Sequence, residues 1–232
     1  MIVFFNTGYA QIIEVTYQQK SNFSENFLTQ IDQLPESRKQ ELINQFEGVI
    51  NHYTVWSDGR QVVRTQDSIT NNCGQEEVYT YPYRQVLVRN EFSWDKYLRI
   101  DGSSDSTLYH IPTESHNGTW EVDYNSTKNI LGFICYYAFN TDNDQEWAWF
   151  TTRIPISLTP DAKFSHHGVV LEFNDSSGTY RAVKVDLIEE RKTFDFFHSP
   201  NQLIHPLNNF REFSVLLTNK LEKISSGSFS CN

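Results

Sequence analysis

The stretch Tyr53-Thr-Val-Trp-Ser-Asp-Gly-Arg-Gln-Val-Val-Arg64 has the pattern of a β-hairpin. Two runs rich in β-branched and aromatic residues flank Asp58-Gly59, a dipeptide typical of the tight turn between antiparallel strands. Upstream of it, Ile13, Val15 and Tyr17 alternate with polar residues. A period of two is typical of a half-buried strand. This part of the chain therefore predicts antiparallel strands.

Strand-like segments continue to the end of the chain. They are Val78–Tyr83, Arg84–Arg89, Lys96–Ile100, Trp120–Asn125, Ile130–Phe139, Trp147–Thr151, Val169–Phe173, Val183–Ile188, Thr193–Phe197 and Phe213–Leu217. Ile130–Phe139 is apolar on both faces, which predicts a central, well-covered strand. So many strands predict a mainly β fold with one large curved antiparallel sheet, a half-barrel or bowl, because a wide sheet tends to curl. A closed sandwich is the alternative.

One segment has helical spacing. Leu42, Ile43 and Phe46 recur at intervals of three and four among polar residues, and Pro35 suits a first helical turn. These features predict a helix from Pro35 to Glu47, packed against one side of the sheet.

Composition limits the classes of partner. The chain has 232 residues and a formal net charge of −10, with no cluster of lysine and arginine. An acidic domain repels phosphate backbones, so we do not expect nucleic acid as a partner. Aromatic residues make up 15% of the chain, a proportion that favours strands. Some of these residues could also form a surface on which sugars or other flat ligands stack.

The first ten residues resemble the end of a secretory signal. In Met1-Ile-Val-Phe-Phe-Asn-Thr-Gly-Tyr-Ala-Gln11 a short apolar run is followed by small and polar residues, with no basic segment before it. A first β-strand is the other interpretation. We expect residues 1–10 to be a truncated signal peptide and 11–232 a single β-rich domain, exported to the periplasm, the cell surface or the medium. No stretch is apolar and long enough for a transmembrane segment.

The three cysteines give no metal pattern. Cys73 and Cys231 lie in polar, loop-like stretches, whereas Cys135 lies in an apolar run. In an oxidising compartment Cys73 and Cys231 are the natural disulfide pair, although the sequence leaves the other two pairings open. Without C-x-x-C or a histidine at ligand spacing we expect no metal and no cofactor.

The middle of the chain resembles the GLPGLI family, exported bacterial proteins of unknown function. The matching segments are Trp120-Glu-Val122, Lys128-Asn-Ile-Leu-Gly-Phe-Ile-Cys-Tyr-Tyr-Ala138, Trp147-Ala-Trp-Phe-Thr151, Ile154-Pro-Ile-Ser157 and Phe164-Ser-His-His-Gly-Val-Val-Leu171. In the last of these, Ser165, His166 and His167 replace the family's Gly-Leu-Pro, and Tyr137 replaces a lysine. The family is similar to the N-terminal bowl-like domain of some secreted peptide-N-glycanases.

The shared motif has the character of a structural core. Its residues are Trp120, Gly132, Cys135, Pro155 and Gly168. Gly168 is expected to adopt a backbone conformation that is unfavourable for other residues. Pro155 is expected at a strand end or bulge, where its missing N–H is harmless.

No catalytic motif is present, so the leading hypothesis is a non-catalytic exported domain that binds a ligand or partner in the cell envelope. A curved sheet could hold a glycan, a peptide or a lipid on its concave face. A carbohydrate-binding or glycopeptide-binding accessory module is the first alternative and a hydrolase the second. The candidate ligand-binding residues are Trp94, Tyr97, Trp147, Trp149, His166 and His167. His166 and His167 are adjacent, so on a strand they would point to opposite faces and not share one metal ion.

Overall fold

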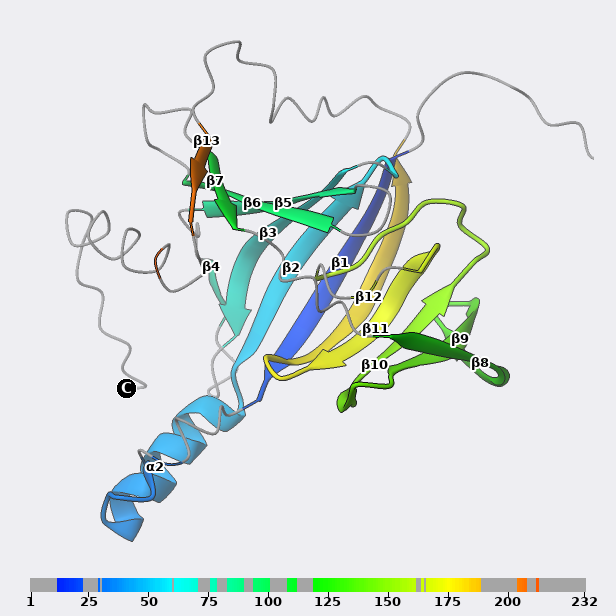
Figure 1. Ribbon diagram of the computed structural model, residues 1–232. Helices are drawn as coiled ribbons and strands as arrows, with labels where there is room; N and C mark the ends of the chain where they lie inside the picture. Colours follow the sequence, from blue (N-terminus) through cyan, green and yellow to red (C-terminus); the bar gives the residue numbers. More distant parts are fainter. Residues whose placement is uncertain are drawn as a thin grey trace, which may run out of the picture.

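The described strands form one large open antiparallel sheet, which is twisted and curved but not closed into a barrel (Figure 1). The predicted fold class is confirmed. The computed structural model describes residues 12–22, 29, 31–59, 61–70, 76–78, 83–89, 94–100, 108–111, 119–161, 164, 166–188, 204–207 and 212. The expected signal peptide at 1–10, the strands at 193–197 and 213–217, Cys73 and Cys231 lie outside these residues.

The order of strands along the sheet differs from their order in the chain. The strands are β1 (Ile12–Ser21), β2 (Ile50–Ser57), β3 (Gln61–Thr70), β4 (Glu76–Val78), β5 (Tyr83–Arg89), β6 (Trp94–Ile100), β7 (Leu108–Ile111), β8 (Trp120–Ile130), β9 (Phe133–Asn140), β10 (Asn143–Thr151), β11 (Val169–Asp175), β12 (Gly178–Ile188) and β13 (Ile204–Pro206). Across the sheet they follow β13-β7-β6-β5-β3-β2-β1-β12-β11-β10-β9-β8, with β4 beside β3. Among the described strand pairs, only β13–β7 is parallel.

Strand β1 holds the two halves of this sheet together. It pairs with β2 on one side and with β12 on the other, so Val15 lies opposite both Val55 and Val185. Ile13, Val15 and Tyr17 are fully buried on one face, as their period of two predicts. The predicted turn at Asp58-Gly59 joins β2 to β3, with Gly59 at a φ of 89°.

The stretch from Ile130 to Phe139 is not one central strand. It bends at Leu131 and Gly132, whose φ angles are 51° and 85°, and so becomes the turn of the β8–β9 hairpin. β8 forms the edge of the sheet, and Ile134 on β9 is 41% exposed. The prediction failed because the residues on both sides of the turn are apolar, so the turn does not interrupt the apolar run in the sequence.

Helix α2 (Glu36–Glu47) begins one residue after the predicted start and ends at the predicted residue, but it does not have the predicted place. It extends away from one end of the sheet (Figure 1), and none of its described side chains is buried. The expectation that it packs against a face of the sheet is therefore wrong. Its polar residues pair with one another or with nearby residues, as in Arg38–Glu41 and Lys39–Asp32. No described helix is long and apolar enough to cross a membrane.

A crossing segment of the chain, described at residues 152–161, 164 and 166–168, fills the inner face of the sheet in place of a helix. It leaves β10, passes across the sheet and returns to β11 (Figure 1). Ile154, Ile156 and Leu158 are buried in the same apolar cluster as the inward side chains of β1, β2 and β3. Phe164 packs edge-on against Trp120, with ring centroids 5.0 Å apart. Burial of these side chains contributes to the hydrophobic stabilisation of the fold.

Hydrogen bonds fix the far end of the crossing segment. The hydroxyl of Ser57 donates to the carbonyl of Ser157 at 2.7 Å, and the guanidinium of Arg64 donates to the carbonyl of Pro160 at 2.9 Å. Arg64 also lies over the ring of Tyr53, 4.9 Å from its centroid. Pro155 is exposed within this segment, past the end of β10, and not at a bulge in the ladder.

Candidate functional site

Four aromatic side chains form a platform on the outer face of the sheet, the face opposite the apolar cluster. On β10, Ala148 and Phe150 are buried inward, so Trp147 and Trp149 point outward and are half-buried. On β9, Tyr137 and Phe139 lie directly opposite Trp149 and Trp147. We call Tyr137, Phe139, Trp147 and Trp149 the aromatic platform.

Tyr137 contacts two of the other three rings of the platform. The centroids of Tyr137 and Trp149 are 5.1 Å apart, and those of Tyr137 and Phe139 are 6.0 Å apart with their planes 26° from parallel. Such contacts hold these three rings in position, and all four rings are only partly buried. The platform is therefore an ordered apolar surface.

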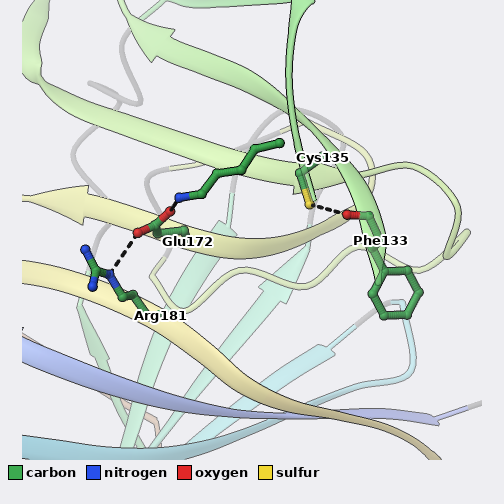
Figure 2. Close-up of polar contacts among 5 residues, drawn as sticks. Phe133, Cys135, Glu172 and Arg181 are labelled. Carbon is green, nitrogen blue, oxygen red and sulfur yellow. Dashed lines mark hydrogen bonds and ion pairs between the residues drawn. The ribbon is translucent and has the colours of Figure 1, made fainter. Parts of the chain in front are cut away.

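An ion network borders the platform on the side of β11 and β12. Glu172, the register partner of Trp149 and of Arg181, is buried on this outer face. One carboxylate oxygen binds the ammonium of Lys128. The other accepts a hydrogen bond from Nε of Arg181 at 2.9 Å (Figure 2). Lys128 also lies over Trp149, with its Nζ 5.6 Å from the ring centroid. The network thus connects β8, β10, β11 and β12.

Cys135 is buried beside this network and is unoxidised. Its thiol lies 3.6 Å from the carbonyl of Phe133 (Figure 2). Burial raises the pKa of Cys135 to about 11, because the thiolate would lose its hydration. A thiol in this environment packs as a small apolar group and is not a nucleophile near neutral pH.

Acidic side chains lie on the opposite border of the platform, along edge strand β8. Glu121 and Asp123 are the register partners of Phe139 and Tyr137. The hydroxyl of Ser126 and the backbone N–H of Asn125 donate hydrogen bonds to Asp123 and lower its pKa. The platform therefore has acidic side chains along β8 and the cation Arg181 toward β12, while Lys128 extends from β8 over Trp149 to Glu172.

The other predicted aromatic residues lie on the other half of the sheet. Tyr97 is on β6, where its ring centroid is 4.8 Å from that of His110. Burial, followed by the charge of Asp95, raises its pKa. The backbone of Trp94 begins the same strand. Since β5, β3, β2, β1, β12 and β11 lie between β6 and β10 in the sheet, the structure brings together only Trp147 and Trp149 of the four.

His166 and His167 have different environments. His166 is partly buried between aromatic rings, and its Nε2 is 3.3 Å from the carbonyl of Trp120. His167 is exposed and lines a depression of about 210 Å³ whose other residues are Thr152, Ile154, Pro155, Ser157 and Gly168. No carboxylate of the described residues lines this depression. The side chain of His166 thus packs inside the protein, whereas that of His167 faces the solvent.

The platform offers apolar rings and charged groups to a ligand. Both oxygens of Glu172 are taken by cations. Within the described part of the chain no three histidine, cysteine, aspartate or glutamate side chains gather as a metal site would require. Half-exposed rings beside polar groups suit the apolar face of a ligand.

Reasoning from the sequence missed five residues of this region: Tyr137, Phe139, Lys128, Glu172 and Arg181. A signal for the first two was present. Tyr137 and Phe139 have the same two-residue spacing as Trp147 and Trp149, on the other side of a polar turn, so a hairpin would place the four rings on one face. Glu172 and Arg181 become neighbours only through pairing of β11 with β12.

Comparison with known proteins identifies a related fold. No family model and no curated protein matches the sequence. The fold is similar to part of PNGF-II. This chain matches two structures of that peptide-N-glycanase at 13% and 14% identity, each with a TM-score of 0.52, covering 90% and 89% of this chain and 33% of PNGF-II. A third structure, an uncharacterized conserved protein from Thermus thermophilus, has 6% identity and a TM-score of 0.38 over 85% of this chain and 91% of its own.

This comparison supports the predicted similarity to a glycanase domain at the level of the fold. The chain spans about a third of PNGF-II. The resemblance to the GLPGLI family stays a prediction.

Proposed function

We propose that this chain is an exported, non-catalytic domain of the GLPGLI type that binds glycan on its aromatic platform. The observation that carries the proposal is the group of four half-buried rings, Tyr137, Phe139, Trp147 and Trp149, on one outer face. The faces of sugar rings carry C–H groups that pack on aromatic rings, while their hydroxyls bond to polar neighbours. The platform offers both kinds of contact.

The inner face is less suited to this role. In its described part, the crossing segment occupies the space between β3 and β10 with buried apolar side chains. A ligand on the concave face would have to displace Ile156 and Leu158 from the core. For this reason we assign binding to the outer face and not to the concavity that the sequence suggested.

The comparison with PNGF-II adds a reason to choose glycans over peptides or lipids. PNGF-II is named as a peptide-N-glycanase, and a domain of similar fold could hold a glycoprotein substrate near a catalytic unit. We therefore propose the glycan of an N-linked glycopeptide as the first ligand to test.

The test is a titration of the protein with a desialylated biantennary N-glycopeptide, followed by calorimetry and tryptophan fluorescence. Replacement of Trp149 or Trp147 by alanine should lower the affinity about tenfold or more, because each removes a ring from the platform. Tyr124→Ala is the matched control, since Tyr124 is 65% exposed and packs on Tyr136 outside the platform. Unchanged affinity in Trp149→Ala, with circular dichroism like that of the wild type, would exclude the platform.

Export is the second part of the proposal. The apolar run before Ala10-Gln11 supports it, and mass spectrometry of the protein recovered from its native source tests it. A mature chain beginning at or near Gln11 is expected outside the cytoplasm. Recovery of a chain that keeps residues 1–10 from the cytoplasm would contradict the proposal.

A further inference from the structure

We infer that the aromatic platform selects a saccharide bearing a carboxylate, bound by Arg181. This inference rests on the proposed function and names the class of ligand. It starts from the ion network at Glu172, which carries two cations and one anion. Because Glu172 is buried, the charges that a ligand meets are those of Lys128 and Arg181.

Arg181 has the geometry of an anion-binding group. Its side chain is 71% exposed, yet the bond from Nε to Glu172 fixes the guanidinium in place. The terminal Nη groups have no hydrogen-bond partner among the residues that the structure describes. A guanidinium that is held at Nε and open at its two Nη groups matches the two oxygens of a carboxylate.

The surroundings of Arg181, in the described part of the chain, add no competing acid except Glu172. Its register partner on β1 is the neutral Gln18, and its same-face neighbours on β12 are Thr179 and Val183. Of the other acids on this face, Glu121 and Asp123 lie beyond the platform on β8, whereas Glu14 and Asp186 lie farther along β1 and β12, where Asp186 pairs with Lys184. A bound sugar would thus have its carboxylate toward β12 and its neutral end toward β8.

The spacing suits a single sugar or a disaccharide. Trp149, Glu172 and Arg181 are register partners on three adjacent strands. Two strand spacings amount to roughly 10 Å. A ring stacked on Trp149 can therefore carry, on itself or on the next residue, a carboxylate that reaches Arg181. Glu172 lies between these two residues, where it is buried and paired with Lys128.

The experiment compares acidic and neutral ligands on one platform. The probes are a sialylated biantennary N-glycopeptide, its desialylated form, and trigalacturonate, so that sialic and uronic acids are tested separately. At least one acidic probe should bind about tenfold more tightly than the neutral one. This preference should shrink with added salt, since the pair is exposed.

The variant that tests the residue is Arg181→Gln. It should abolish the preference for the acidic probe while the affinity for the neutral probe changes by less than about twofold. Arg181→Lys, which keeps the charge and cannot form the fork, should retain only part of the preference. Arg38→Gln on helix α2 removes the same charge from an exposed arginine and is the control.

Each result separates this inference from the proposed function. Equal binding of acidic and neutral probes, lost in Trp149→Ala, would overturn the inference and keep the platform. A preference that survives in Arg181→Gln would also overturn it. If none of the probes binds, both fail. Suppose that Trp149→Ala still binds the acidic probes and that Arg38→Gln weakens this binding as much as Arg181→Gln does. The effect would then be nonspecific attraction of charge, and both the inference and the proposed function would be overturned.

Discussion

Gly168 shows how one residue fixes the end of the crossing segment. Its φ is 129°, in agreement with the expectation from the sequence, and a Cβ at this position would lie 2.4 Å from the carbonyl oxygen of Thr151. Two causes therefore exclude a side chain here, an unfavourable backbone conformation and a direct clash. Two residues earlier, His166 packs between the rings of Phe150 and Phe164.

We predict that Gly168→Ala lowers the free energy of unfolding by about 2–4 kcal/mol, measured in urea. Gly132→Ala is the control, because Gly132 also has a positive φ but its added Cβ would have no neighbour within 4 Å. It should lose only about 1 kcal/mol. Equal losses would show that the clash at Thr151 is relieved by movement of the loop.

We predict that Cys135 resists alkylation in the folded protein. With its pKa raised to about 11, the reactive thiolate is scarce at pH 8. The rate with iodoacetamide should therefore be about two orders of magnitude below that of the urea-unfolded chain, whose cysteine has an ordinary pKa. Peptide mapping by mass spectrometry distinguishes Cys135 from the other cysteines. Equal rates in both states would refute the assigned burial.

The same shift has a consequence for stability. The folded pKa of Cys135 is above that of the unfolded chain, so the unfolded state releases its proton first. The contribution of the neutral thiol is fully present below the unfolded pKa. It is lost as the pH rises from about 8.5 toward 11.

At the scale of elements, the β8–β9 hairpin contains a residue poorly suited to its conformation. Leu131 has a φ of 51° and is 46% exposed, and Gly132 follows it at 85°. Two successive positive φ angles are typical of a type I′ turn, for which Asn-Gly is preferred. At this position leucine adopts an unfavourable backbone conformation, and burial of its side chain does not compensate for that cost.

We predict that Leu131→Asn raises the free energy of unfolding by about 0.5–1 kcal/mol, because asparagine tolerates the left-handed region. For a chain of this size that corresponds to a rise in Tm of roughly 1–4 °C in a calorimetric scan. The same substitution at Leu187, which is 60% exposed on strand β12, should be neutral or destabilising. A lower Tm for Leu131→Asn would show that Leu131 packs on another part of the protein.

At the scale of the whole molecule, β1 makes the sheet a single unit. Its pairing with β12 joins residues such as Ile12 and Ile188, far apart in the sequence, and its pairing with β2 joins the other half. Neither half has a complete inner face without the buried side chains of β1. This arrangement predicts slow folding, because segments that are distant in the sequence must meet before these strands can pair.

We predict one cooperative unfolding transition. In urea, tryptophan fluorescence and far-ultraviolet circular dichroism should give the same midpoint and slope. Val15→Asp, which places a charge at the centre of β1, should shift both signals together. Two separate transitions would instead indicate that the halves on either side of β1 fold independently.

Local patterns in the sequence determined much of this protein. Period-two alternation located β1, strand-like segments located β10 and β11, Asp58-Gly59 located the β2–β3 turn, and helical spacing located α2. The pair Trp147 and Trp149 was also correctly placed on one strand. These features depend on residues within a few positions of one another, and such interactions can be read from a linear pattern.

Long-range pairing decided the rest. The place of β1 between β2 and β12, the path of the crossing segment and the ion network at Glu172 all join residues far apart in the chain. Helix α2 has an amphipathic pattern but no sheet face to cover, because the crossing segment already fills the inner face. The sequence alone could predict strands and turns. Only the tertiary structure showed which face is open and which cation lies beside Trp149, since both depend on strand order and register.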